Sequence, residues 1–378
     1  MAIVIIIILA SVFLYVLQAR IFQKIWSKNL DVDINFERSY AIEGEQANLI
    51  ETITNAKWFP IPILHVKFQI HRNLKFLSMK NAQVSDKIYK SDMFSLFFYQ
   101  RITRSLPFLC SKRGYYSITG ADIVAYNMFF TGHMVSLREQ DTHFYVYPRP
   151  VSVAQLEIPY RRMMGLMTTK RFLYQDPFAF QGIRDYEIFD PLKTVNWKAS
   201  ARSGSLKTNT YEYTAGQQIC LLLNLEDEAI LREERLLETS ISLTASLAER
   251  FLSEGVPVSI YTNGRDLETK QEISLPAASG LSQIQQINQQ LARIDLDLPI
   301  SVFPTLTERI DEMHDELESA CMIVVSYCQR AETDTAIRKL ADRYPGLLWL
   351  LPLYPETEAF PDADANVHVM KWEVEHLV

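Results

Sequence analysis

The sequence predicts an α+β multidomain protein that consists of an N-terminal transmembrane helix, an antiparallel β-sandwich-like module and an α/β domain with a doubly wound sheet. Three patterns predict it: an uncharged apolar run at the N-terminus, then strand-like runs separated by turn residues, then strands that alternate with helices. A chain of 378 residues has room for two folded domains beside an anchor. The expected segments are 1–29 (anchor and juxtamembrane helix), 30–150 (β-rich module), 151–215 (linker and motif segment) and 216–378 (α/β domain).

The anchor is predicted from Ala2 to Ala19, a run without any charged residue in which only Ser11 and Gln18 are polar. As a helix it would span about 27 Å, which is enough to cross the hydrocarbon core of a membrane. A cleaved signal peptide is the alternative. It usually has a basic start, a shorter apolar region and a small-residue cleavage site, and none of these is clear here. We therefore expect an uncleaved, single-pass anchor.

The orientation follows from the charges that flank the anchor. Arg20, Lys24 and Lys28 come directly after it, and this excess of positive charge predicts that the bulk of the chain is cytoplasmic. Trp26 is expected at the membrane interface. Residues 1–115 hold 15 Lys and Arg but 8 Asp and Glu, in a chain whose net charge is −7. A basic membrane-proximal part suits an anionic leaflet, although unequal solvated faces would give the same count.

The cysteines agree with a reducing compartment. The chain has four of them, none in a CxxC pair. Cys220 and Cys321 lie in apolar strand-like runs, where a reduced thiol behaves as a small apolar side chain. A disulfide framework is therefore not expected.

The β-rich module shows turn signals at Glu43-Gly44 and at residues 112–114. His65 and His71 occupy alternate strand positions and have no spaced Cys or carboxylate partner, so we interpret them as structural. An aromatic cluster is interpreted as core or as a partner-facing edge, in preference to a stacking platform for nucleic acid. Its members are Phe94, Phe97, Phe98 and Tyr99.

The second half of the chain alternates buried strands with helices, and the last buried strand is expected over residues 346–354. Residues 150–175 have few turn signals and several basic and Met residues, so we expect an exposed linker or a membrane-facing loop there.

The most distinctive motif runs from Phe180 to Tyr213, and within it VNWKASARSG predicts a short helix that ends at Gly204. The segment resembles the signature of domain-of-unknown-function family 58 (DUF 58), bacterial membrane-associated proteins. That resemblance implies the same order of anchor, β module and α/β domain, so it covers essentially the whole chain. The matching residues are Gly182, Arg184, Asp185, Tyr186, Asp190, Asn196, Trp197, Lys198, Ala199, Ser200, Ala201, Arg202, Leu206 and Lys207.

Three readings of this motif stay open. In the first, Arg184, Asp185 and Arg202 form an internal ion-pair network, and Trp197 packs against the next domain. In the second, the motif is an interaction site, because exposed Arg and Trp are frequent interface anchors. An enzymatic anion site is a third reading, for which no nucleophile is evident. The candidate interaction residues are Gly182, Arg184, Asp185, Tyr186, Asp190, Asn196, Trp197, Ser200 and Arg202.

The α/β domain resembles the von Willebrand A fold. That resemblance implies a metal site built on Asp-x-Ser-x-Ser after the first strand. Here the stretch is Asn224 to Glu228, with Asn for the Asp and Glu226 and Glu228 for the serines, so we expect the metal site to be lost. A rearranged acidic site that includes Asp227 is the alternative. Acidic residues favoured at a helix N-terminus are the simpler account.

No catalytic motif is found, and the spacing of Cys328 and His314 does not suggest a nucleophile pair. We therefore expect a non-enzymatic, membrane-anchored scaffold or adaptor without a cofactor and without nucleic-acid binding. The resemblance implies partners such as a MoxR-type AAA+ ATPase or a transglutaminase-like membrane protein. The alternative is a von Willebrand A-type ligand-binding or adhesion module, either metal-dependent or degenerate.

Overall fold

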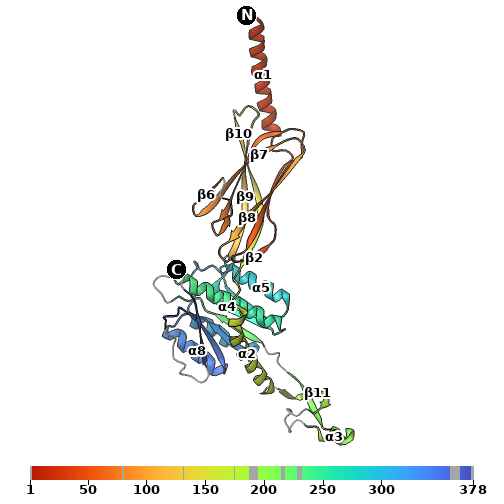
Figure 1. The fold of residues 1–378 in the computed structure, drawn as a ribbon, viewed down its shortest axis with the longest axis vertical. Helices are drawn as coiled ribbons and strands as arrows, with labels where there is room; N and C mark the ends of the chain where they lie inside the picture. Colours follow the sequence, from red (N-terminus) through yellow and green to blue (C-terminus); the bar gives the residue numbers. More distant parts are fainter. Residues whose placement is uncertain are drawn as a thin grey trace. The chain divides into compact units, whose positions relative to one another are not determined.

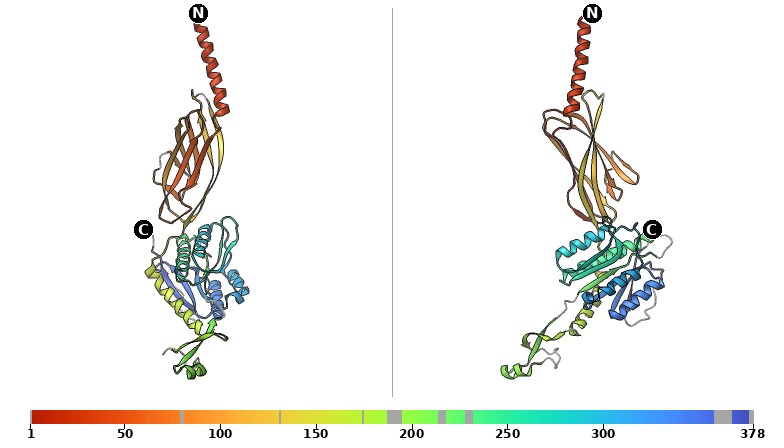
Figure 2. Two further views of the ribbon diagram at one scale, coloured as in Figure 1. Left: turned by 90° about the vertical axis from the view of Figure 1, so that its right-hand side faces the viewer. Right: turned by 180° about the vertical axis from the view of Figure 1, so that it is seen from behind.

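The computed structural model divides into two compact units, Met1–Arg149 and Pro150–Val378, each of which is described by itself. Figures 1 and 2 show the helices and strands of both. The structure describes residues 2–78, 81–130, 132–173, 175–186, 195–213, 218–227, 232–357 and 367–375.

The first unit begins with the apolar helix α1 (Ala2–Ile25). Among the described residues it is the one helix that is long and apolar enough to cross a membrane. Its last turns are part of the β module, since Phe22 and Trp26 are buried in the module's core. The ring of Trp26, which the sequence suggested for the membrane interface, is therefore enclosed by protein.

The β module contains two facing sheets, as the alternating burial of their strands requires. The core between them takes Ile34 and Leu49 from one sheet and Val66 and Ile123 from the other. All strand pairs are antiparallel except β2 with β10. The first sheet has the order β1 (Leu30–Phe36), β3 (Gln46–Asn55), β8 (Gln100–Cys110), β5 (Leu74–Phe76). The second has the order β2 (Tyr40–Ile42), β10 (His133–Tyr147), β9 (Gly114–Tyr126), β4 (Ile61–His71), β7 (Lys87–Leu96), β6 (Ala82–Val84).

Both turns expected from the sequence are present. Gly44 has a φ of 92°, which a glycine adopts readily, and the chain between β8 and β9 crosses from one sheet to the other. The aromatic cluster is split. Phe94 is buried in the core, whereas Phe97, Phe98 and Tyr99 are exposed.

The second unit is built on one six-stranded sheet. Five strands are parallel, and β15 lies antiparallel at one edge. The order of the strands is β15 (Glu272–Ala278), β14 (Val258–Arg265), β13 (Ile219–Leu223), β16 (Cys321–Val325), β17 (Leu347–Leu353), β18 (Val367–Glu373). The strand expected to be the last, β17, is followed by β18, a partly buried strand whose sequence VHVMKWE mixes apolar and charged residues.

Helices cover both faces of this sheet, so the strands are apolar on both sides. One face packs on α2 (Val153–Leu173), α4 (Glu234–Ser253) and α5 (Leu281–Arg293). The other packs on α6 (Phe303–Glu312), α7 (His314–Leu317) and α8 (Ala331–Arg343).

The expectation of a linker or loop over residues 150–175 is wrong, because α2 occupies most of that range. Leu156, Tyr160, Met163 and Met167 lie on one face of the helix and are buried in the core with α4. The Arg250 guanidinium lies 4.1 Å from the centre of the Tyr160 ring. The apolar face explains the helix, and Arg161 and Arg162, which suggested a loop, are exposed.

The four cysteines are all buried as free thiols. Burial raises the pKa of Cys110 to about 11 and that of Cys220 to about 12.

Four charged side chains are buried or half-buried between the sheets of the β module. Asp92 is completely buried, and its Oδ2 forms an ion pair with Arg104 Nη2 at 2.6 Å. The other carboxylate oxygen of Asp92, Oδ1, lies 3.8 Å from Lys90 Nζ. Glu51 is nearly as buried, and its carboxylate has Arg104 Nε at 3.7 Å. Burial, together with the charge of Asp92, raises the pKa of Glu51 from 4.5 to about 7 despite the two cations.

This raised pKa predicts a pH-dependent stability. Glu51 is protonated in both folded and unfolded chains at low pH, and its ionisation opposes folding as the pH rises from 4.5 to about 7. Relative to wild type, the Glu51→Gln module should gain about 3 kcal/mol between about pH 4 and pH 8. Pulse proteolysis in urea, on the full chain in detergent, measures this. Glu139→Gln, on an exposed position of β10, is the control, and equal pH profiles for the two variants would contradict the prediction.

Candidate functional site

The motif segment folds into a small arm made of β11 (Gln175–Asp185), α3 (Trp197–Ser203) and β12 (Lys207–Tyr213). The two strands form an antiparallel sheet of their own, separate from the six-stranded sheet. Gly182 pairs with Thr210 beside a register shift, and Arg184 pairs with Thr208. For Arg184 the structure describes the backbone only, and Asp190 lies outside the described residues.

Asn196 and Ser200 hold α3 on the arm. Asn196 Oδ1 accepts a hydrogen bond from Ala199 N at 2.9 Å and so caps the helix. Ser200 Oγ donates to Asn196 O and accepts from Lys207 N, both at 2.8 Å, which ties the helix to β12. Gly204 ends the helix at a φ of 72°, as the sequence predicts. These contacts make Asn196 and Ser200 structural residues of the arm.

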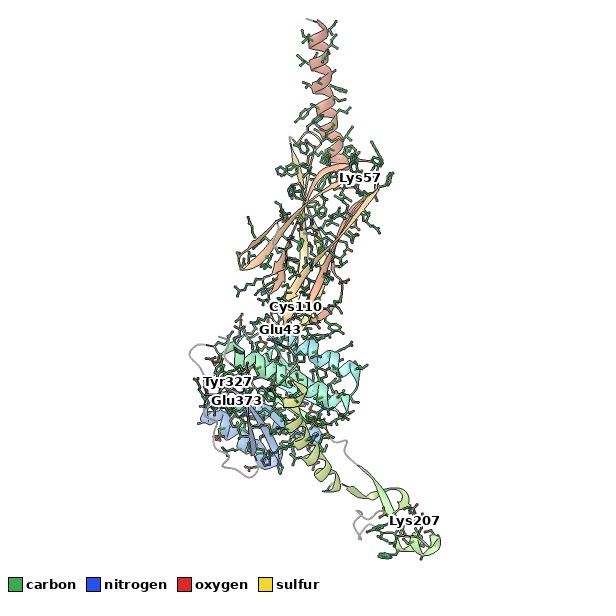
Figure 3. The ribbon with its side chains drawn as sticks, in the orientation of Figure 1. Glu43, Lys57, Cys110, Lys207, Tyr327 and Glu373 are labelled. Atoms are coloured by element: carbon green, nitrogen blue, oxygen red, sulfur yellow. The ribbon has the colours of Figure 1, made fainter. Side chains whose placement is uncertain are left out.

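Most of the other described motif side chains are exposed. Trp197 is 67% exposed, and Lys198 and Arg202 are exposed on the same short helix. Asp185 pairs with Lys207 Nζ at 2.6 Å, on the surface (Figure 3). The first reading expects Trp197 to pack against the α/β domain, but within its unit the side chain is largely exposed. Tyr186 is half-buried, and its N–H donates to Leu206 O.

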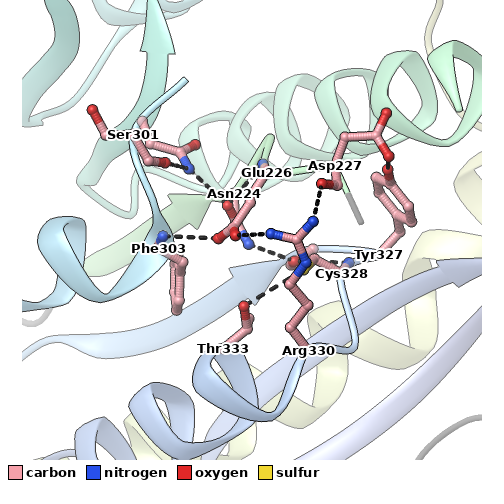
Figure 4. Close-up of polar contacts among 11 residues, drawn as sticks. Asn224, Glu226, Asp227, Ser301, Phe303, Tyr327, Cys328, Arg330 and Thr333 are labelled. Carbon is pink, nitrogen blue, oxygen red and sulfur yellow. Dashed lines mark hydrogen bonds and ion pairs between the residues drawn. The ribbon is translucent and has the colours of Figure 1, made fainter. Parts of the chain in front are cut away.

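A second polar cluster lies where β13, β14 and β16 end (Figure 4). Asn224 follows β13, and its Nδ2 donates to Ser326 Oγ after β16 at 2.9 Å. Its Oδ1 accepts from Asn263 Nδ2 at 2.7 Å and from Glu226 N at 2.9 Å. The order of the strands reverses between β13 and β16, and open α/β sheets bind ligands at such a point. Here the side-chain amides of Asn224 and Asn263 and the hydroxyl of Ser326 form hydrogen bonds with one another.

The two described acidic residues after β13 are also engaged. Glu226 Oε2 accepts from Phe303 N, the first residue of α6, at 3.0 Å, and its Oε1 pairs with Arg330 Nη1 at 2.9 Å. Asp227 accepts from the Tyr327 hydroxyl and from Glu233 N just before α4. Both carboxylates thus meet donors near helix N-termini, where negative charge is favoured.

These residues do not fit the hard divalent cation that a von Willebrand A-type site would hold. Such a cation needs carboxylate and hydroxyl oxygens free to point at it. Asn224 Oδ1 already accepts two N–H groups, and Glu226 already accepts Arg330, which brings its own positive charge. The described residues contain no cluster of His, Cys, Asp and Glu suited to a metal. Glu228 lies outside the described residues.

Sequence reasoning missed Asn263 and Arg330. Asn263 could have been found, because it lies near the end of its strand as Asn224 does after the neighbouring one. Arg330 precedes α8 and carries no local signal, since its role depends on the segment after β16 meeting the segment after β13. Cys328 Sγ lies 3.5 Å from Thr333 Oγ1, and His314 lies beside the Tyr344 hydroxyl, so each has a partner other than the pair considered from the sequence.

No protein-family model matches the chain, and no curated protein matches it. Three solved structures similar to part of it are a cohesin of Acetivibrio cellulolyticus in complex with a dockerin, a non-cellulosomal cohesin of Archaeoglobus fulgidus and the CARDB domain of a Pyrococcus furiosus protein in complex with di-metal ions. Their identities are 16%, 15% and 11%, and their TM-scores are 0.24, 0.22 and 0.20. They cover 31%, 34% and 30% of this chain and 98%, 96% and 90% of their own. Identities and TM-scores this low do not allow the function of any of these proteins to be assigned to this chain.

The Glu226–Arg330 pair predicts a local stability effect. Arg330→Met leaves the buried Glu226 carboxylate without its cation, whereas the guanidinium itself is 46% exposed and partly screened. We expect a loss of about 1–2 kcal/mol, measured as faster hydrogen exchange of the β13 and β16 amides. The control is Arg338→Met, which removes the helical pair with Asp334 and should change exchange by less than about 0.5 kcal/mol. A similar effect of both variants would contradict the assignment.

Proposed function

We propose that this chain is a membrane-anchored, non-enzymatic scaffold of the DUF 58 type, whose arm binds a protein partner. The exposed pair of Trp197 and Arg202 on α3 carries this proposal, because Trp and Arg are the side chains most often found at interface hot spots. A helix of two turns that buries none of its own residues gains little from folding by itself. The hydrogen bonds of Asn196 and Ser200 nevertheless hold it in place, as a presented surface requires.

The anchor part of the proposal is supported by the way α1 ends. Cleavage at the end of the apolar run would place Phe22 and Trp26 at a frayed terminus, although both belong to the core of the β module. A helix that is integrated in this way suits an uncleaved anchor better than a signal sequence. Arg20, Lys24 and Lys28 favour a cytoplasmic location for the rest of the chain, in a bacterial membrane as the resemblance implies.

The α/β unit is proposed to be of the von Willebrand A type, without a metal. A strand order that follows the chain as 3-2-1-4-5-6 supports this, and so does the polar cluster at the point of reversal. Because Glu226 and Asn224 are already engaged, a metal-dependent adhesion module is the less favoured function. Titration calorimetry of the full chain with magnesium chloride tests it, and a heat of binding that Glu226→Gln abolishes would restore that alternative.

The proposed partner is a MoxR-type AAA+ ATPase, with a transglutaminase-like membrane protein as the second candidate. Proximity labelling in the native cell, with the label fused after Val378, should mark cytoplasmic proteins and enrich such an ATPase. The double variant Trp197→Ala/Arg202→Ala should lower this enrichment at least about tenfold, since hot-spot residues each contribute more than about 1 kcal/mol. Leu281→Ala, which removes another largely exposed apolar side chain, on α5, is the matched control.

Three outcomes of the labelling experiment would contradict this proposal. Labelling of extracytoplasmic proteins would overturn the orientation. Unchanged enrichment in the double variant would place the partner site elsewhere than on α3. A loss of enrichment in Leu281→Ala as well would indicate that the effect is not specific to the arm.

A further inference from the structure

Three loops at one end of the β module carry large apolar side chains that face outward. They are residues 56–60 between β3 and β4, 97–99 between β7 and β8, and 127–130 between β9 and β10. We call their exposed side chains, which are between 43% and 71% exposed, the aromatic collar. Its members are Trp58, Phe97, Phe98, Tyr99, Met128, Phe129 and Phe130. Apolar side chains gathered in this way mark a binding surface.

Hydrogen bonds fix the first two loops to each other. The buried Asn55 side chain donates from Nδ2 to Phe59 O at 2.9 Å and to Phe97 O at 2.7 Å. Tyr99 N donates to Lys57 O at 3.0 Å. Trp58, Phe97, Phe98 and Tyr99 therefore lie on loops that a polar network beneath them holds together.

The first of these loops, residues 56–60, also holds the end of α1. Lys57 Nζ donates to Trp26 O at 2.8 Å and so satisfies a carbonyl at the end of the helix (Figure 3). Phe59 packs on Phe22 with 5.9 Å between ring centres. Burial lowers the pKa of Lys57 to about 8. The collar thus surrounds the point where the apolar helix leaves the module.

One contact shows which part of α1 lies beside the third loop of the collar. The Phe129 ring lies 6.0 Å from the ring of Tyr15, within the uncharged run of α1. Tyr15 is four residues before Ala19, where that run ends, which corresponds to about 6 Å along a helix. Side chains that lie in a membrane interface reach about 5–10 Å into the boundary of headgroups and acyl chains.

The charges around the collar suit phospholipid headgroups. Arg20, Lys24 and Lys28 are exposed on and just after the last turns of α1, and Arg101 is exposed at the start of β8, directly after the loop 97–99. Anionic headgroups attract basic residues at this level, and aromatic rings are favoured there.

We propose that the aromatic collar inserts into the headgroup boundary of a bilayer that contains anionic lipids, so that the β module is docked on the membrane around α1. This inference rests on the anchor part of the proposed function. The bilayer is the occupant because the collar is continuous with a helix that itself requires lipid, and because Phe129 lies level with that helix's apolar run.

The test uses the full chain in nanodiscs of phosphatidylcholine and phosphatidylglycerol whose acyl chains carry bromine, which quenches tryptophan fluorescence at short range. The fluorescence of Trp58 is obtained as the difference between the fluorescence of the wild type and that of Trp58→Phe. The matched control, Trp58→Phe/Tyr40→Trp, keeps the number of tryptophans and moves the exposed ring to β2, at the other end of the β module (Figure 1). We expect the Trp58 signal to be quenched at least about twofold more than the signal of the relocated ring in the control, as for a ring inserted about 5–10 Å.

Equal quenching of the two signals, in a chain that resists carbonate extraction, would overturn the collar and leave the anchor intact. Extraction by carbonate would instead refute the anchor, and with it the proposed location. A photo-crosslinking amino acid at Phe98 separates the possible occupants. A lipid adduct supports the inference, whereas a crosslinked dimer would assign the collar to a second copy of the chain and overturn it.

Discussion

The C-terminal end of the apolar helix α1 has carbonyl groups that need hydrogen-bond donors, and the first unit of this protein depends on how that need is met. Lys57 donates to Trp26 O from the turn between β3 and β4, and the side chains of Phe22 and Trp26 complete the core beneath. Helix and β module therefore fold as one body. An ammonium group is buried to make this contact, which is tolerated because the carbonyl dipoles at a helix end attract positive charge.

In the second unit an arginine side chain neutralises an acidic residue at the point where the order of the strands reverses. In a sheet with this strand order, the point between β13 and β16 is where a ligand is expected, and acidic residues placed there would repel one another without a cation. Arg330 supplies that cation from the start of α8 and joins it to Glu226 and to the carbonyl of Asp227. Because a guanidinium stays charged at any physiological pH, the cluster does not depend on the concentration of an ion.

The sequence was sufficient for features set by local pattern. The apolar run, the turn at Gly44 and the stop of the short helix at Gly204 all follow from the chemistry of one or a few residues. It was insufficient where long-range packing decides. The helical spacing of the apolar residues in α2 was obscured by the basic residues in the same segment. The strand β18 pairs with β17 along its length, although its own sequence mixes apolar and charged residues.

The same distinction separates the two candidate sites. The arm was visible as a motif, yet its sequence did not say which of its residues support the helix and which face solvent; Ser200 and Trp197 have these opposite roles. The cluster at the ends of the strands unites Asn224, Asn263, Ser326 and Arg330 from four separate segments. Only the tertiary fold brings those together, and the sequence revealed just the first.

The burial of the four cysteines has a practical consequence. Alkylating reagents and disulfide exchange act on the thiolate of an accessible side chain, and burial of these sulfurs removes the access, while the raised pKa of Cys110 and Cys220 also removes the thiolate of those two. The native chain should thus be nearly silent toward maleimides while folded. A single cysteine introduced on its surface would then be the one reactive group, so that spin labels or fluorophores could be attached site by site without first deleting the natural thiols.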